Sequence, residues 1–296
     1  MARKRRAAKR PKGATKTPTA VKRSARAALS VATSGRRPVR KRVAAMAQAP
    51  LAVCESDKDL QAMLNVLRSE DEPVKVRLAA LQSLGAAAFS VIAFESCRGD
   101  YLAALRKVAT DPKPELRQRV LGLLMREKDG FAQRKLLEGL KNPDKALVPP
   151  EKALQLLSYD VHAEAYAAAR AIVSKPPNPD ARREALRLLA ADATAAPLFE
   201  KLLRDKNELR EIRQISASAL HALKPDRLQQ VAREIVLDKS DYDDIKATSL
   251  MALATFGDKA LANDKVLLNS IGRFGAGKAP SKYKQGARRF LRKYGR

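Results

Sequence analysis

The stretch Glu70–Gly85, EDEPVKVRLAALQSLG, decides the fold of this chain. Acidic residues and Pro73 supply the start signals of a helix, and apolar side chains then recur at helical spacing. When Arg77 is taken as an anchor, a small residue (Ala80) follows three positions later and a large one (Leu84) seven positions later. Offsets of three and seven lie on one face of a helix, so this stretch predicts a helix that packs closely against a neighbour.

The same pattern recurs along the chain at intervals of 31 to 40 residues. The anchors are Arg77, Arg117, Pro150, Arg182, Arg213, Lys246 and Lys284. The leucines seven positions later are Leu84, Leu124, Leu157, Leu189, Leu220, Leu253 and Leu291. The small residues three positions later are Ala80, Ala153, Ala185, Ser216, Ser249 and Ala287, with Val120 as the exception. Apolar companion segments such as Ala196–Asp205 lie between anchors, so we predict an all-α solenoid of about seven helix pairs.

This unit resembles the short form of the HEAT-repeat family, whose pattern is D-P-x-x-x-V-R-x-x-A-x-x-x-L-G. Glu70–Gly85 matches best, and Asp111–Leu124 and Glu208–Leu223 also match. The third unit departs from the pattern, with Pro150 at the arginine position. The resemblance covers residues 57–296 and implies a right-handed α-solenoid. That family consists mostly of scaffolds, adaptors and nucleic-acid binders, with a few lyases and DNA glycosylases among its relatives.

Positive charge is concentrated at the two ends of the chain. The 296 residues include 59 Lys+Arg and 32 Asp+Glu, which gives a formal charge of +27. Residues 1–45 hold 16 of the basic residues and residues 265–296 hold ten, with no acid in either segment. Residues 46–264 are therefore nearly neutral. Segment 1–50 has no aromatic and few large apolar residues, so it is predicted to be a disordered basic arm that precedes the solenoid at 51–296.

Both ends carry further patterns. The apolar spacing from Val21 to Ala32 fits a helix formed on a partner, which Gly35 and Pro38 would end. The composition of the arm resembles the tails of linker histones and of bacterial histone-like proteins. At the other end, basic residues recur from Lys284 to Arg296 every four positions, which predicts a cap helix with a continuous charged stripe.

These charges favour a non-enzymatic, nucleic-acid-binding scaffold, because basic side chains can follow a phosphate backbone and release its counterions. The predicted contacts are Arg3, Lys4, Arg5, Arg6, Lys9, Arg10, Lys12, Arg36, Arg37, Arg40, Lys41, Arg42, Lys284, Arg288, Arg289, Arg292, Lys293 and Arg296. The chain has no zinc finger and no aromatic RNA-binding signature, so contact is expected to be largely independent of sequence, with DNA favoured over RNA. The solenoid groove is expected to hold a protein partner.

Two alternatives stay open. One is a protein–protein adaptor whose arm is a targeting signal, since Lys4–Lys12 has the charge density of a nuclear-import signal. The other is a ribosome-associated RNA-binding protein. In each case the expected location is a reducing compartment inside the cell, in the cytoplasm and nucleoid or in the nucleus.

No pattern predicts catalysis, a metal site or a cofactor. Cys54 and Cys97 form no CxxC pair and are expected to be separate thiols, while His162 and His221 lie 59 residues apart. Segment Gly272–Lys282 lacks the hydroxyl residue that a phosphate loop needs after its Gly-Lys. We therefore expect no catalytic residue, no metal, no cofactor and no small-molecule substrate. No apolar stretch is long enough for a membrane span, so no membrane partner is expected.

Overall fold

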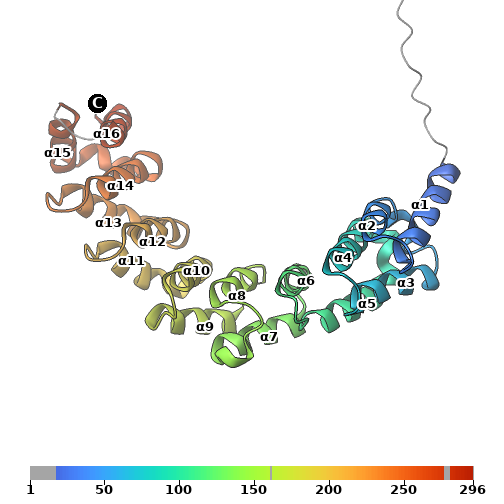
Figure 1. Cartoon of the computed structure of the whole chain (residues 1–296). Coiled ribbons are helices and arrows are strands. Elements are labelled where there is room, and N and C mark those ends of the chain that lie inside the picture. The colour runs from blue at the N-terminus through green and yellow to red at the C-terminus, as the bar shows by residue number, and fades with distance from the viewer. Residues whose placement is uncertain (1–17, 161, 277–280, 296) are drawn as a thin grey trace, which may run out of the picture. The chain divides into compact units, whose positions relative to one another are not determined.

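The computed structural model describes residues 18–160, 162–276 and 281–295. These residues contain sixteen α-helices, four short 3-10 helices and no strand, which confirms the all-α prediction (Figure 1). The α-helices are α1 (Pro18–Thr33), α2 (Val39–Met46), α3 (Asp57–Arg68), α4 (Val74–Ala88), α5 (Val91–Val108), α6 (Pro114–Arg126), α7 (Gly130–Lys141), α8 (Pro150–Leu157), α9 (Ala163–Ser174), α10 (Pro179–Leu189), α11 (Ala196–Arg204), α12 (Arg210–Leu223), α13 (Pro225–Leu237), α14 (Asp243–Phe256), α15 (Lys265–Ala276) and α16 (Ser281–Tyr294). The 3-10 helices are η1 (Pro50–Ala52), η2 (Pro143–Lys145), η3 (Ala193–Ala195) and η4 (Lys259–Asn263).

Apart from α7 and α8, consecutive helices pack in pairs, from α1 with α2 to α15 with α16, and the chain divides into two compact units. In unit 1 (Met1–Ala132), the second helices α2, α4 and α6 pack on one another in order, as do the first helices α1, α3 and α5. In unit 2 (Gln133–Arg296), the second helices α8, α10, α12, α14 and α16 pack on one another in the same way. Pairs stacked in this manner make a HEAT-like helical-repeat fold.

The anchor register read from the sequence is confirmed by burial. Leu84, Leu124, Leu157, Leu189, Leu220 and Leu253 are all fully or almost fully buried. The residues three positions after each anchor, from Ala80 to Ala287, are buried as well. In the last repeat, Tyr283, Phe290 and Tyr294 belong to the core cluster against α14, with Leu291 partly buried beside them. The small residue and the leucine of each second helix therefore pack against neighbouring helices, as their spacing predicts.

Two anchor arginines are themselves buried, and they link successive turns. The Arg77 guanidinium donates Nε to the carbonyl of Leu67 at 2.9 Å and Nη2 to Asp111 at 2.5 Å. Arg213 donates Nε to the carbonyl ten residues earlier at 2.8 Å and binds both carboxylate oxygens of Asp241 at 2.6 Å. Each arginine satisfies a carbonyl near the end of one helix and an acid in the following turn, so burial leaves neither charge unpaired.

The predicted arm boundary at residue 50 needs correction, because residues 18–50 are largely helical. Helix α1 packs on α2, η1 and α3, and it buries Ala25, Leu29 and Ala32 at helical spacing. Arg42 repeats the anchor geometry, with Nε bound to the carbonyl of Ala32 at 3.0 Å and two bonds to Glu72 at 2.6 and 2.7 Å. The pair α1 and α2 is thus one more repeat. Residues 1–17 lie outside the described residues.

The two cysteines also correct an expectation, because Cys54 and Cys97 form a disulfide. Cys54 follows η1, Cys97 lies in α5, and their Cα atoms are 6.3 Å apart. The stacking of the first helices brings together two residues that are 43 positions apart in the sequence. Spacing along the chain could not show this pairing, since neither cysteine belongs to a local motif.

Candidate protein-binding groove

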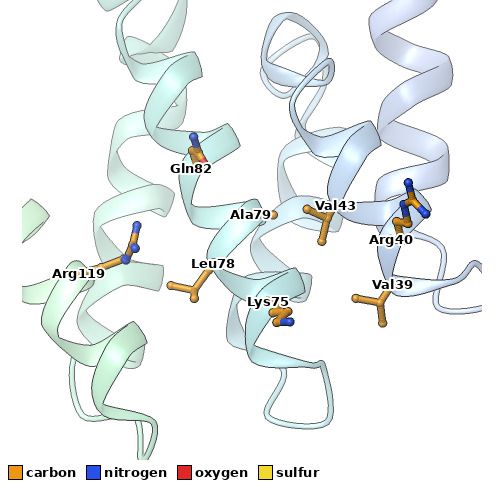
Figure 2. A pocket seen from close by; sticks show the side chains of 8 residues that line it. All are labelled: Val39, Arg40, Val43, Lys75, Leu78, Ala79, Gln82 and Arg119. Carbon is orange, nitrogen blue, oxygen red and sulfur yellow. The ribbon is translucent and has the colours of Figure 1, made fainter.

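The outward face of α4 consists of the residues that do not point into the core. Val76, Arg77, Ala80 and Leu84 are buried, and the opposite face carries Lys75, Leu78, Ala79 and Gln82. This outward set follows the spacing i, i+3, i+4 and i+7, so its four side chains form one stripe along the helix. Because α2 and α6 flank α4, the stripe lies at the centre of the second-helix row of unit 1 (Figure 2).

An open hollow of about 630 Å³ lies along this stripe. Its lining is Val39, Arg40 and Val43 from α2, Lys75, Leu78, Ala79 and Gln82 from α4, and Arg119 from α6. Figure 2 shows Val43 and Ala79 facing each other across the gap between α2 and α4, with Leu78 on the side toward α6. Aliphatic side chains therefore form the floor, and basic side chains from three helices stand around it. We call this set of eight residues the unit 1 groove.

The charge of the unit 1 groove has one sign. Among the described residues, neither Arg40 nor Lys75 has an acid within ion-pair distance, and Arg119 has only a loose contact with Glu115 at 3.6 Å. The first turns of α2 and α4 contain no acid. Since the N-terminus of a helix is itself partly positive, Arg40 and Lys75 add charge where an acid would be favoured. The charged side chains of this lining are therefore all positive, and they stand beside aliphatic side chains.

The corresponding face of α10, in unit 2, is charge-compensated. In α10, Arg183 pairs with Asp180 and also contacts Glu211 of α12 at 3.4 Å. Arg187 pairs with Glu184 and contacts the same Glu211 at 3.6 Å. The basic residues on this face are therefore already held by neighbouring acids. Helix α10 therefore offers an anionic partner fewer uncommitted cations than α4 does.

The structure disperses the residues that the sequence predicts as a nucleic-acid interface. Those from Arg3 to Lys12, together with Arg296, lie outside the described residues. Arg36 and Arg37 are exposed before α2, and Arg40 and Lys41 are exposed on it. Arg42 is buried against Glu72, which corrects its predicted role as a ligand contact, because its guanidinium is committed to the fold.

The predicted C-terminal contacts lie on α16, in unit 2. Arg288, Arg289 and Arg292 are exposed, and Lys284 is half-buried. Lys293 is exposed, but its Nζ donates to the carbonyls of Ala254, Thr255 and Gly257 at 3.2 to 3.4 Å. That lysine therefore closes the end of α14 as well as carrying charge.

Sequence reasoning missed most of the unit 1 groove. Lys75, Leu78 and Arg119 lie in the near-neutral middle of the chain, where total charge gave no signal. The available signal was the outward stripe that remains once Arg77, Ala80 and Leu84 are assigned to the core. Reading that stripe in each repeat would have shown basic and aliphatic residues in α4 and paired charges in α10.

Other kinds of site find no support in the part of the chain that the structure describes. No group of three or more His, Cys, Asp or Glu side chains there could hold a metal ion. His221 stacks on Phe256 with ring centroids 3.7 Å apart, and His162 precedes α9. None of the described helices has the length and apolar content required to cross a bilayer.

No protein-family model matches the chain, and no curated protein does. Among solved structures, it is similar to the complex of CpcE and CpcF of phycocyanin lyase from Nostoc sp. PCC7120. The match has 15% sequence identity and a TM-score of 0.27, and it covers 98% of each chain.

This comparison contradicts two predictions from the sequence. The matched structure is described as a complex of two proteins, CpcE and CpcF, of a lyase, whereas the sequence predicts a non-enzymatic chain that binds nucleic acid. We withdraw the prediction of a non-enzymatic, nucleic-acid-binding scaffold. The physical reason for the error is that excess positive charge attracts any polyanion, so the amount of charge alone does not identify a partner.

Proposed function

We propose that this chain is a helical-repeat protein-binding module, and that the unit 1 groove receives an acidic segment of a partner protein with aliphatic side chains. The observation that carries the proposal is the combination of Arg40, Lys75 and Arg119 with the aliphatic floor of Val43 and Leu78. Outward second-helix faces are the surfaces that stacked repeats leave available for partners.

The two chemical components of the groove support different parts of the recognition. Aliphatic side chains of a partner gain free energy by leaving water on the floor, by about 25 cal/mol per Å² of buried apolar area. Acidic side chains of the partner attract the basic residues around the groove. This attraction raises the association rate, and repulsion excludes basic segments. A segment with only aliphatic or only acidic side chains would make one of these two kinds of contact and bind more weakly.

The direct test is fluorescence anisotropy with a labelled synthetic peptide of about a dozen residues that alternates Glu with Leu. Two further peptides separate the components, one with Gln in place of every Glu and one with Ala in place of every Leu. We expect the Glu/Leu peptide to bind most tightly. Each altered peptide should have a dissociation constant at least about tenfold higher. A tenfold change corresponds to roughly 1.4 kcal/mol of binding free energy.

Variants then locate the binding site. The double variant Arg40→Glu, Lys75→Glu should weaken binding of the Glu/Leu peptide about tenfold or more, since two attractive contacts become repulsive. The matched control is Arg187→Glu in α10, an exposed arginine on the corresponding face of unit 2, which should leave binding unchanged. The proposal fails if the wild-type chain does not bind the Glu/Leu peptide, or if the double variant and the control bind it equally.

A further inference from the structure

A second surface of unit 1 lies at the turn between α4 and α5, away from the residues of the unit 1 groove. Phe89, Val91 and Ile92 are exposed there, with Phe89 88% and Ile92 95% accessible to solvent. Leu51 of η1 is also exposed. Several large, highly exposed apolar side chains within four positions are unfavourable in water, and contiguous patches of this kind usually mark an interaction surface.

A hollow of about 640 Å³ lies directly beside these exposed side chains. Ser90 and Ala93, which alternate with Phe89 and Ile92 along the same turn, line it. Leu51 and Phe94 add apolar surface to the lining. One short stretch of chain thus carries both a protruding apolar knob, Phe89 and Ile92, and one wall of an adjacent hollow.

The charges around this hollow have both signs. Lys22 and Arg26 of α1 line one side, and Glu55 lines another. Among the described residues, Lys22 and Glu55 have no ion-pair partner, and Arg26 is only 3.9 Å from Asp59 in a largely exposed contact. A purely acidic or a purely basic partner would therefore meet repulsion somewhere on this face. A surface with the same two signs in a complementary arrangement would not.

We infer that this face binds a second copy of the same chain. In a two-fold dimer the same patch meets itself, so a knob and a hollow on one face fill each other twice. Phe89 and Ile92 of each copy would enter the hollow of the other, and Lys22 and Arg26 would approach the other copy's Glu55. A second copy of the chain therefore matches both the shape and the charges of this face.

The disulfide supports a preformed interface. Cys54 lines the hollow, and its bond to Cys97 ties the segment after η1 to α5. Two walls of the hollow are therefore held in place before association, which lowers the ordering cost that binding must overcome.

The test is sedimentation equilibrium of the full chain, from roughly 5 to 300 µM, a range that brackets a micromolar dissociation constant. Salt at about 0.3 M limits repulsion between two chains that each have a formal charge of +27. We expect the average mass to rise from 32.4 kDa toward twice that value as concentration increases. A wild-type chain that stays at 32.4 kDa over the whole range overturns the inference.

The double variant Phe89→Asp, Ile92→Asp tests whether dimerisation depends on these two side chains. Because both side chains are almost fully exposed, the variant should keep the helical circular dichroism and thermal unfolding of the wild type. It should remain at 32.4 kDa at every concentration, whereas Val266→Asp, which alters an exposed apolar residue of α15, should dimerise like the wild type. A double variant that still dimerises overturns the inference.

Two further measurements separate this surface from other occupants and from the unit 1 groove. Co-sedimentation with vesicles of phosphatidylcholine and phosphatidylserine tests a lipid surface, and a monomeric chain that binds them through Phe89 and Ile92 overturns the dimer. Arg40→Glu, Lys75→Glu should dimerise normally, and Phe89→Asp, Ile92→Asp should still bind the Glu/Leu peptide. Failure of one proposal is therefore visible independently of the other.

Discussion

Helix α4 in unit 1 and helix α10 in unit 2 share a buried register and differ on their outward faces. Both place small and leucine residues at the same offsets from the anchor, and in both the anchor arginine binds a carboxylate of a following turn. Outward, α4 carries Lys75 and Leu78 without a local acid, whereas Arg183 of α10 is paired with Asp180. The inward residues therefore build the repeat, and the outward residues distinguish one repeat from another.

The difference begins at one position, two residues before the anchor. In α10, α12 and α14 that position holds Asp180, Glu211 and Asp244, in the first turn, where an acid is stabilised by the helix dipole. In α2 and α4 it holds Arg40 and Lys75, while α6 of unit 1 has Glu115 there and α16 of unit 2 has Lys282. The helix dipole favours an acid at this position, so helix stability does not account for Arg40 and Lys75.

The largest predicted effect concerns the buried register. Arg213→Ala should lower the free energy of unfolding by about 3–5 kcal/mol, because it leaves the carboxylate of Asp241 buried without its partner. Arg187→Ala should change it by less than about 1 kcal/mol, since that arginine forms surface ion pairs. Urea unfolding followed by helical circular dichroism measures both.

Unit 1 supplies the matched pair of variants. Arg77→Ala should be strongly destabilising, as Arg213→Ala is, and Lys75→Ala should be nearly neutral. If Lys75→Ala and Arg77→Ala destabilise equally, the distinction between inward and outward residues is wrong.

The disulfide is a second difference between the units, because it joins two segments of unit 1. Cys54→Ser should lower the stability of the oxidised chain by about 2–4 kcal/mol, chiefly because the unfolded chain gains freedom when a closed loop is opened. The same loss should follow when the wild type is reduced with a phosphine. Reduction should have no effect on the variant, and an equal response of both chains would show that the bond does not stabilise the fold.

Asp241 in unit 2 should make the stability of the fold depend on pH. Burial alone would raise the pKa of Asp241, but hydrogen bonds from Arg213 and from the backbone N–H of Tyr242, with the charge of Arg213, hold that pKa below its ordinary value. A carboxylate whose pKa is lower in the folded chain stabilises the fold above its unfolded pKa, and loses this contribution as pH falls through the folded pKa. Stability should therefore decline below about pH 4.

Urea midpoints between about pH 7 and pH 3 measure this dependence, and Asp241→Asn is the control. The variant should be less stable than the wild type at neutral pH and should lose less stability on acidification. An identical slope for both chains would mean that other carboxylates account for the acid sensitivity.

The repeat register could be predicted from the sequence because it depends on local spacing. The offsets of three and seven from Arg77, Arg182 and Arg213 identified the core leucines. Such residues are constrained by burial, so each repeat shows the same pattern. Pro150 replaces an anchor arginine without loss of the helix, because proline is tolerated in the first turn of α8.

The remaining features depend on contacts between segments that are distant in the sequence. The first repeat was missed because its anchor, Arg42, lies among many exposed basic residues, although Pro38 precedes it at the same distance as Pro73 precedes Arg77. The Cys54–Cys97 bond and the unit 1 groove arise only when consecutive repeats stack. Charge counted along the chain directed attention to the ends and away from Lys75.

We propose that the outward face of unit 1 recognises an acidic, aliphatic segment through opposite charge. The most direct test inverts both partners, with Arg40→Glu, Lys75→Glu, Arg119→Glu on the chain and Lys in place of every Glu in the Glu/Leu peptide. We predict that the inverted chain binds the Lys/Leu peptide and rejects the Glu/Leu peptide, while the wild type does the reverse. If both chains bind each peptide with the same affinity, charge complementarity at this groove is contradicted.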